Sequence, residues 1–528
     1  MIKVLTSDQL HAADQYTMDH EPVLSIDLME RAAHSLQFSI TEEIKISPHS
    51  AFYIFCGYGN NGGDGLALGR LLYPDAESVN IFCLADKKQH TPDFNTNFER
   101  LIKIPMVNHF LIKNENDFPA IPENAVIIDA IFGSGLNKPL SGLPKKLVKF
   151  LNEQKSKRIA IDIPSGLFAD HFTADISFHA DHTITFHSPK FSFLFADNYE
   201  SIGDVHTADI GLNKEFIASL PVKNFLLEEH DIRVRLQSRK KFDHKGKFGH
   251  AFIHAGNIGK MGAAIMCARA CARTGAGLTT AHIPQNQSSL LNIAVPEVMT
   301  EEYSNSHALD LDLSKFSSFA FGPGIGTHDH QRGTFFSLLK KISACAVFDA
   351  DALNLLSEEK NWWKLIPENS ILTPHPKEFE RLAGKTSNWE ERHNHQLKLS
   401  TEHSLFIILK GALTCITTPE GYSFFNPTGN PAMAKGGSGD VLTGMIVSLL
   451  AQHYSPQDAC IISVYLHGLA ADLAVEYESA ESLLASDIID RIGDAFRKIE
   501  NPDDPFPDPP GGFDYEEDDQ ERDILGLN

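Results

Sequence analysis

Short apolar runs alternate with longer amphipathic stretches along the first 210 residues of the chain. Four of these runs have the length and apolar content of buried parallel strands, and they span residues 51–56, 79–84, 126–129 and 158–162. Segments of helical length, such as 91–103 and 143–154, separate them. The alternation predicts an α/β fold with a doubly wound sheet. Two amphipathic helices, at 7–19 and 24–44, are expected before the first strand.

A second α/β alternation begins near Leu226 and carries its own glycine-rich turns, at residues 256–262, 322–326 and 436–440. The chain is therefore expected to fold as two domains, residues 1–214 and 226–500, with a linker around 212–225. From residue 501 to residue 528 the sequence becomes rich in proline and acidic residues. Such a composition cannot form a core, so this tail is predicted to be disordered.

Charge and composition narrow the classes of function. The 528 residues carry a net charge of −23, of which the ten acidic residues and one arginine of the tail supply −9. An acidic chain is poorly suited to duplex nucleic acid or to an anionic membrane, because both need a basic face. No apolar run approaches the roughly 20 residues that cross a bilayer, and the first residues lack a signal-peptide core, so a cytoplasmic enzyme is expected. The seven cysteines form no C-x-x-C pair, which argues against a disulfide framework.

The first chemical motif is the loop Gly57–Gly65, between a predicted strand and a helix expected to begin near Leu66. It satisfies G-x-G-x-x-G, a pattern that lets backbone N–H groups approach a phosphate at a helix N-terminus. Asp86, at the end of the next strand, is an alternative ribose ligand of a dinucleotide site. The loop could also be no more than a tight turn, although its asparagines and aspartate add polar oxygens that a plain turn does not need.

Two further strand ends should meet this loop, because ligands of open α/β sheets bind beyond the carboxyl ends of the strands. They carry Asp129 and the segment Asp162–Gly166, which contains Ser165. With Asn61, these residues form a set of hard oxygens that could hold a monovalent cation beside a general acid or base. The competing interpretation is that each aspartate caps a turn.

In the second half, residues 426–440 are rich in small side chains and lead into an apolar helix predicted over 441–451. Small residues at a helix N-terminus leave backbone N–H groups free to hold a phosphoryl group. Asp440 would lie beside this anion hole, where a carboxylate can take the proton of a hydroxyl during phosphoryl transfer. A structural turn with a helix cap is the alternative.

Together these motifs resemble the family of bifunctional NAD(P)H-hydrate repair enzymes, in which an NAD(P)HX epimerase precedes an ADP-dependent NAD(P)HX dehydratase. The resemblance covers the chain to about residue 500 and implies a Rossmann-like first domain and a ribokinase-like second domain. Its N-terminal motifs are Met29-Glu30, 57–65, the Asp129 loop, 162–166 and 180–190. Its C-terminal motifs are 244–246, 262–264, 322–324, 349–354, 373–376, 410–412 and 436–440.

For the first domain, the resemblance implies that Asp162 is the substrate-facing acid or base and that Asn61, Asp129 and Ser165 hold K⁺. Proton transfers would open and re-form the carbinolamine at C6 of the hydrated nicotinamide ring, which interconverts the R and S epimers. Lys138 is a second candidate for proton transfer. The implied substrate-lining residues are Asn60, Asn61, Gly62, Gly63, Asp64, Gly133, Ser134, Gly135, Leu136, Asn137, Lys138 and Pro139.

For the second domain, the resemblance implies that Asp440 is the base for phosphorylation of the C6 hydroxyl by ADP. Departure of phosphate then restores NAD(P)H and leaves AMP, with Mg²⁺ neutralising the nucleotide phosphates. The implied contacts to the S epimer are Ala263, Gly324, His375 and Asp440, and those to the nucleotide are Lys410, Gly411, Ala412, Leu413, Thr414 and Gly439. The resemblance also implies a homo-oligomer, a tetramer built on the dehydratase domains, that acts on NADHX and NADPHX.

Two other functions remain open from the residues alone. A ribokinase-like small-molecule kinase with a fused nucleotide-sensing domain would use the same anion hole and base, but its phosphorylated product would survive. A non-enzymatic first domain would be a nucleotide-binding scaffold, because a bare fold does not fix function. The presence of Asp129, Asp162 and Ser165 together argues against the scaffold.

Overall fold

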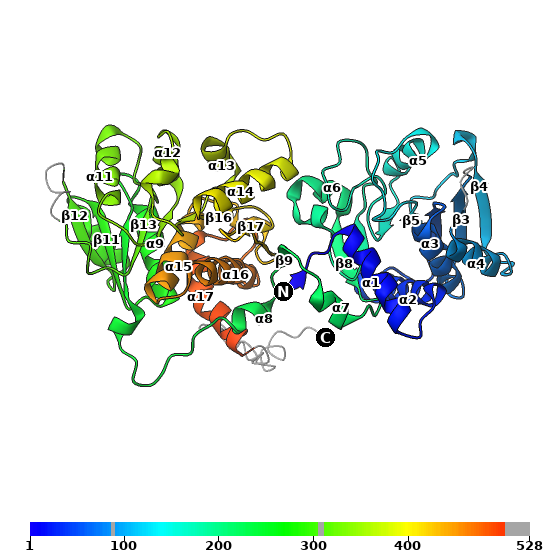
Figure 1. Ribbon diagram of the computed structural model, residues 1–528, viewed down its shortest axis with the longest axis horizontal. Coiled ribbons are helices and arrows are strands. Elements are labelled where there is room, and N and C mark those ends of the chain that lie inside the picture. The colour runs from blue at the N-terminus through cyan, green and yellow to red at the C-terminus, as the bar shows by residue number, and fades with distance from the viewer. Residues whose placement is uncertain (86–89, 305–310, 502–528) are drawn as a thin grey trace, which may run out of the picture.

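The computed structural model describes residues 1–85, 90–304 and 311–501. It forms two α/β lobes that lie side by side along the long axis of the molecule (Figure 1). The first lobe is a sheet of seven strands with its helices, and the second is a sheet of eleven strands with its helices. Asp86 lies outside the described residues, as does the predicted tail from residue 502 onward.

The sheet of the first lobe is parallel throughout, in the order β4-β3-β2-β5-β6-β7-β8. Its strands are β2 (Ala51–Cys56), β3 (Ser78–Leu84), β4 (Asn108–Ile112), β5 (Val126–Ala130), β6 (Lys157–Ile161), β7 (His182–Phe186) and β8 (Asp204–Ala208). The four strands expected from the sequence all form, each within one residue of its predicted ends. The predicted α/β class is confirmed.

Helices cover both faces of this sheet. The longer helices are α1 (Ser7–His20), α2 (Ser25–Phe38), α3 (Asn60–Leu72), α4 (Pro92–Leu101) and α5 (Gly142–Asn152). The shorter ones are α6 (Tyr199–Ile202) and α7 (Lys214–Ser219). A π-helical turn at Ser39–Glu43 extends α2. Side chains of α2 and α3 share one apolar cluster with the sheet, and those of α5 share another with its opposite face.

The start of α3 corrects one prediction. The helix begins at Asn60 rather than near Leu66, so the polar residues of the glycine-rich loop lie in its first turns. Glycine is a poor helix former, which is why the sequence favoured a later start. Packing outweighs that preference here: a Cβ on Gly62 would lie 2.2 Å from the carbonyl oxygen of Gly57, so only glycine allows the helix to approach the end of β2 this closely.

The sheet of the second lobe is mixed, in the order β1-β9-β18-β17-β16-β15-β14-β13-β10-β11-β12. Its parallel part consists of β10 (His250–His254), β11 (Leu278–Pro284), β12 (Met299–Tyr303), β13 (Ser318–Phe321), β14 (Ala346–Phe348), β15 (Ile371–Leu372) and β16 (Phe406–Leu409). The strands β17 (Thr414–Thr417) and β18 (Ser423–Asn426) continue it in antiparallel fashion.

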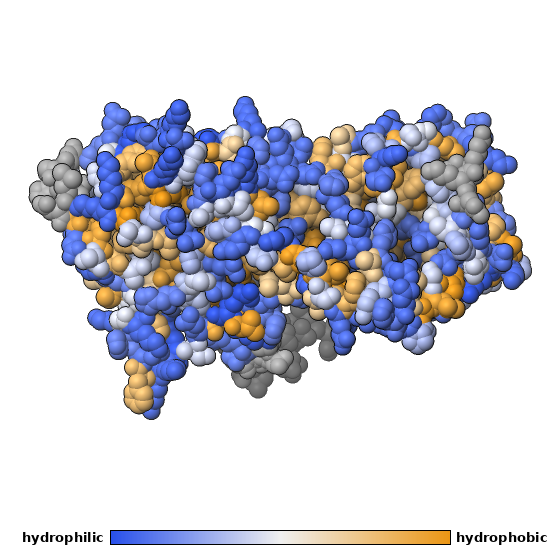
Figure 2. Space-filling model, in the orientation of Figure 1, coloured by the Kyte–Doolittle hydropathy of each residue, from blue (hydrophilic) through white to orange (hydrophobic). Residues whose placement is uncertain are grey.

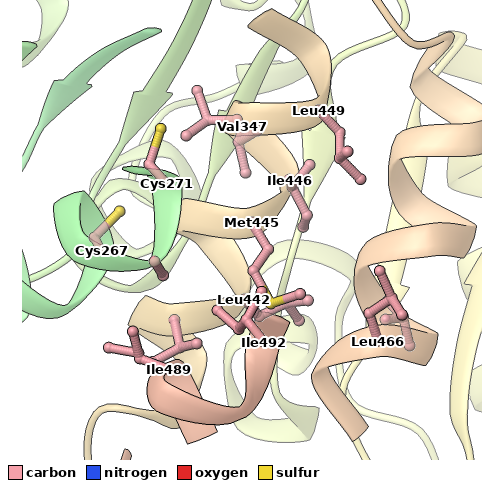
Figure 3. Packing of buried hydrophobic residues seen from close by; sticks show 14 of the residues in the cluster. Cys267, Cys271, Val347, Leu442, Met445, Ile446, Leu449, Leu466, Ile489 and Ile492 are labelled. Carbon is pink, nitrogen blue, oxygen red and sulfur yellow. The ribbon is translucent and has the colours of Figure 1, made fainter. Parts of the chain in front are cut away.

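Helices pack on both faces of the second sheet as well. One face carries α9 (Met261–Thr274), α15 (Ser438–Ala451), α16 (Pro456–Ala474) and α17 (Ala485–Glu500), whose apolar side chains interlock in the largest core cluster (Figure 3). The other face carries α11 (Asp329–Leu339), α12 (Ala350–Ser357) and α13 (Pro376–Ala383). The remaining helices are α8 (Glu229–Arg233), α10 (Ser288–Ala294) and α14 (Trp389–His403).

The N-terminus is built into the second sheet. Strand β1 (Ile2–Lys3) pairs with β9 (Asn224–Leu226), which in turn pairs with β18. The segment expected as a linker is therefore structured: it holds α7, whose Phe216 stacks on Tyr16 of α1, and it enters β9. The domain boundaries themselves remain a prediction.

Apolar side chains also join the two lobes. Val4, which directly follows β1, and Leu194 of the first lobe form a buried cluster with Cys415 and Phe425 of the second lobe, here called the interface cluster. Much of the surface in view is hydrophilic, with apolar patches scattered among polar residues (Figure 2). Among the described residues no helix has both the length and the apolar character to span a bilayer.

Candidate active sites

The carboxyl ends of β2, β5, β6 and β7 surround a cavity of about 650 Å³ in the first lobe, called the first cavity. Most of the predicted substrate residues line it: Asn60, Asn61, Asp64, Gly133, Ser134, Gly135, Leu136, Asn137, Lys138, Pro139 and Asp162. Gly62 and Gly63 do not. Gly62 packs against Gly57 and Gly63 against Met29, so both act by letting α3 pack closely. The pattern of strand ends thus brings three separate loops to one opening.

Asp162 is held at the wall of this cavity by both of its carboxylate oxygens. Oδ1 lies 2.8 Å from the ammonium nitrogen of Lys190, which is only 1% exposed, and Oδ2 accepts the N–H of Ser134 at 2.9 Å. Burial alone would raise the pKa of Asp162, but the charge of Lys190 and these hydrogen bonds leave it below its ordinary value. The residue has a φ of +64°, so the chain bends sharply after β6 to turn the side chain inward. The carboxylate is therefore a stable anion.

Asp129 and Ser165 lie together behind the cavity wall rather than on it. The Ser165 hydroxyl donates to Asp129 Oδ1 and its N–H donates to Oδ2, each at 2.7 Å. Burial raises the pKa of Asp129 to about 6 in spite of these hydrogen bonds. The side-chain amide of Asn61 is buried and neither its nitrogen nor its oxygen has a hydrogen-bond partner. A buried amide of this kind is expected to meet a ligand or ion.

A second cavity, of about 760 Å³, lies in the second lobe between the end of β16, the start of α15 and α16. Six predicted residues line it: His375, Lys410, Gly411, Ala412, Thr414 and Gly439. The side chain of Leu413 instead packs against the interface cluster. Ala263, Gly324 and Asp440 lie outside the lining. Ala263 and Gly324 are close to each other, since a Cβ on Gly324 would be 2.9 Å from that of Ala263.

Asp440 lies in the first turn of α15, because this helix begins at Ser438, three residues before its predicted start. Burial is the main reason that the pKa of Asp440 rises to about 7, and the carboxylates of Asp349 and Asp351 add to the effect while Lys410 opposes it. A carboxyl with this pKa can take a proton near neutral pH.

An ion pair lies beneath the anion hole. Lys410 Nζ is 2.9 Å from Asp349 Oδ1, and the Thr443 hydroxyl donates to Oδ2 at 2.9 Å. A Cβ on Gly439 would lie 3.3 Å from Lys410 Nζ, so this lysine reaches the first turn of α15. The arrangement joins the ends of β14 and β16 to the helix that would hold a phosphoryl group.

Sequence reasoning assigned no role to several residues at the two cavities. Lys190 and Asp349 lie within motifs of the family. Asp349 directly follows β14 and Lys190 lies four residues after β7, so their position was a usable signal. His467 lies within the apolar helix α16 and Asp14 within α1, where no local motif marks them. Asp14 lines the first cavity and His467 lines the second.

Two family models match the chain. The model described as NAD(P)H-hydrate dehydratase matches residues 251–493, and the model described as YjeF-related protein N-terminus matches residues 25–192. The dehydratase model covers the strand ends at the second cavity, and the YjeF-related model covers the strand ends at the first cavity.

Full-length relatives agree in the order of these regions. The chain is 32% identical to the bifunctional NAD(P)H-hydrate repair enzyme Nnr of Moorella thermoacetica over 94% of this chain and 97% of that one. It is 30% identical to the enzyme of the same name from Escherichia coli K12 over 85% of each. The crystal structure of an ADP/ATP-dependent NAD(P)H-hydrate dehydratase from Bacillus subtilis, co-crystallised with ATP and Mg²⁺, is 32% identical and covers 52% of this chain and 99% of that one, with a TM-score of 0.48. Identity that extends over nearly the whole length favours repair over the small-molecule kinase and the scaffold, and the chain belongs to the family of bifunctional NAD(P)H-hydrate repair enzymes.

Proposed function

We propose that the two cavities perform the two steps of NAD(P)H-hydrate repair in one chain, epimerisation in the first cavity and dehydration in the second. Membership of the family gives the two activities, NAD(P)HX epimerase and nucleotide-dependent NAD(P)HX dehydratase. The proposal assigns them to residues 1–214 and 226–500. The observation that carries it is a pair of buried carboxyl groups with shifted pKa values: Asp162 lines the first cavity, and Asp440 follows Gly439, which lines the second cavity at the start of α15.

In the first cavity, Asp162 is the group that accepts the proton of the C6 hydroxyl. Its low pKa keeps it ionised, and the ammonium of Lys190 fixes its orientation. The loop Gly133–Pro139 covers the same opening and supplies the Ser134 N–H that holds Asp162 in place. Lys138, which lines the cavity, remains a candidate for contact with the substrate.

A K⁺ ion is assigned to Asn61, Asp129 and Ser165. The residues fit such an ion because the oxygen of Asn61 is buried without a partner and the other two side chains bring further oxygens to the same strand ends. A monovalent cation there would offset buried negative charge. Asn61 lies on the cavity wall, so the ion would be adjacent to the bound substrate.

At the start of α15, beside the second cavity, Asp440 removes the proton of the C6 hydroxyl as that oxygen attacks the terminal phosphorus of ADP. The C6–O bond then breaks with assistance from the ring nitrogen and gives an iminium, which loses a proton from C5 to form the C5–C6 double bond. Phosphate, AMP and NAD(P)H are the products. The N–H groups of Gly436–Gly439 and the ammonium of Lys410 stabilise the charge that develops on the transferred phosphoryl group. Ala263, Gly324 and His375 are assigned to the S epimer, and Lys410–Thr414 with Gly439 to the nucleotide.

Mg²⁺ would neutralise the phosphates of the nucleotide. Among the described residues no group of three His, Cys, Asp or Glu side chains could hold a metal by itself. Mg²⁺ at sites of this kind usually depends on substrate phosphates and few carboxylates, so we propose that it enters with the nucleotide.

NADHX and NADPHX are both proposed as substrates, and a homotetramer built on the second lobe is the proposed assembly. Light scattering of the purified chain tests the assembly.

Single substitutions test the assignment of the two steps. Asp162→Ala should abolish epimerisation of R-NADHX and leave ADP-dependent recovery of NADH from S-NADHX unchanged, whereas Asp440→Ala should do the reverse. Loss of both activities in either variant would overturn the assignment of one step to each lobe. Replacing ADP by ATP in the second assay tests the donor.

A further inference from the structure

Helix α1 turns one of its faces toward the first cavity. Leu10, His11 and Asp14 all line it, and Leu10 and His11 precede Asp14 by four and three residues, which places them on the same side of a helix. Leu10 and Ala13 pack with Ile210 and Leu212 beyond β8, which fixes the helix against the mouth of the cavity. Asp14 is thus carried to the substrate side by a well-packed element.

The carboxylate of Asp14 is not held by another side chain among the described residues. No hydrogen bond or ion pair joins it to any other residue in the described ranges, whereas both oxygens of Asp162 are engaged by Lys190 and Ser134. Asp64 also lines the cavity, but burial is the main reason that its pKa lies well above the ordinary value, which favours its neutral form. Asp14 is therefore the lining carboxylate best able to change its protonation state.

The surroundings of Asp14 set its acidity. Burial is the main reason that its pKa rises to about 6. The charges of His11, on the same helix, and of Lys190, after β7, lower the pKa, and the charge of Asp162, after β6, raises it. Asp64 on α3 also interacts with Asp14 through its charge. The pKa of Asp162 is shifted in the opposite direction, and two carboxyls whose pKa values are driven apart are the usual signature of an acid and base pair.

We propose that Asp14 is a second proton-transfer group of the epimerase, which acts at the ring nitrogen while Asp162 acts at the C6 hydroxyl. The inference rests on the proposed function of the first cavity. Asp162 takes the hydroxyl proton as the C6–N1 bond breaks; the O–H electrons form the C6 carbonyl, the C–N pair goes to N1, and Asp14 donates a proton to N1. Rotation about the C5–C6 bond exposes the other face of the aldehyde. The reverse steps close the ring as the other epimer and return both protons.

The test compares Asp14→Asn with Asp8→Asn, an exposed aspartate at the start of the same helix that does not line the cavity. Epimerisation of pure R-NADHX is followed by chromatography without nucleotide, so that the dehydratase is silent, and the spontaneous rate is subtracted. Asp14→Asn should lose about 100-fold or more of the rate, within the range of general acid catalysis, and Asp8→Asn none. Dehydration of S-NADHX with ADP, measured on the same preparation, should be unchanged.

The dependence on pH separates proton transfer from a structural role. Because the acid form of Asp14 acts first, the wild-type rate should fall as the pH rises above about 6, and this limb should disappear in Asp14→Asn. Unchanged rate and pH profile in Asp14→Asn would overturn the inference. If Asp14→Asn also loses dehydration, Asp14→Glu is measured instead. Partial epimerisation whose rate falls at a different pH from the wild type supports proton transfer, and a rate that falls at the same pH overturns it. A wild-type chain without epimerisation would overturn the proposed function instead.

Discussion

The ammonium nitrogen of Lys190 lies 2.8 Å from Oδ1 of Asp162, and the two side chains are buried at the ends of the adjacent strands β6 and β7. Burial of two charges costs desolvation free energy, so the main effect of such an ion pair is that each partner keeps the other charged. Lys190 keeps Asp162 ionised inside the lobe, and Asp162 gives the buried lysine a counter-ion. The pair thereby holds the Asp162 carboxylate in a fixed position at the wall of the first cavity.

Removal of the cation should be costly. Lys190→Met leaves Asp162 buried and unpaired, so we expect the first lobe to lose about 3–5 kcal/mol of its free energy of unfolding. The pKa of Asp162 should rise and epimerisation should cease. Chemical denaturation and the R-NADHX assay measure the two effects, with the exposed Lys157→Met as control. A Lys190→Met chain as stable and active as the wild type would show that the pair has no such role.

The second lobe should respond to pH through Asp440. Since its pKa in the folded chain is about 7, the base form required for phosphoryl transfer is lost as the pH falls below that value, and the dehydratase rate should fall with it. The raised pKa also means that the folded state binds the proton more tightly than the unfolded state. Stability due to this group therefore declines as the pH rises from about 4 to about 7.

Asp440→Asn separates these two effects. The variant should lose dehydration at every pH and should melt at a higher temperature than the wild type at pH 8, because a buried charge has been removed. Thermal unfolding at pH 5 and pH 8 checks the second expectation. An equal or lower melting temperature at pH 8 would show that the ionised carboxylate of Asp440 does not destabilise the fold.

Thr443 tests how the anion hole is supported. Its hydroxyl donates to the buried Asp349, so Thr443→Val keeps the shape but leaves one carboxylate oxygen without a partner. We expect a loss of about 1–3 kcal/mol in the stability of the second lobe and a slower dehydratase, with epimerisation unaffected. A stable variant with full dehydratase rate would indicate that Lys410 alone orients Asp349.

His467 should contact the nucleotide. It is 7% exposed, lines the second cavity, and its Nε2 has no hydrogen-bond partner. Burial lowers its pKa to about 4, so the ring is neutral at physiological pH and suits an uncharged group of the nucleoside better than a phosphate. His467→Ala should raise the KM for ADP about 3- to 10-fold, the equivalent of one neutral hydrogen bond, and leave kcat nearly unchanged. The exposed His328→Ala is the control, and a fall in kcat at constant KM would exclude a binding role.

The sequence predicted the sheet of the first lobe well because its strands are buried on both faces and read as continuous apolar runs. Strand β1 could not be predicted, since it has only two residues and forms by pairing with β9, far away in the chain. The start of α3 was placed too late because three glycines lie within its first six residues, and only tertiary packing makes them helical.

The residues of the candidate sites also differ in whether the sequence could identify them. Residues at strand ends, such as Asp129 and Asp162, could be found because parallel strands carry their carboxyl ends to one edge. Asp14 and His467 lie within helices whose pattern indicates burial and nothing more, so their roles depend on which cavity each helix happens to border. Leu413 was included with its neighbours by motif, and the structure turns its side chain toward the interface cluster.

Recovery of NADH from pure R-NADHX by the purified chain, with ADP, Mg²⁺ and K⁺, tests the central claim most directly. The near-ultraviolet absorbance of the reduced ring reports the product, and AMP and phosphate are quantified in parallel. Two active sites in one chain predict recovery well above the spontaneous rate, with one AMP and one phosphate formed for each NADH. A surviving phosphorylated product without NADH, or recovery no faster than spontaneous epimerisation allows, would contradict it.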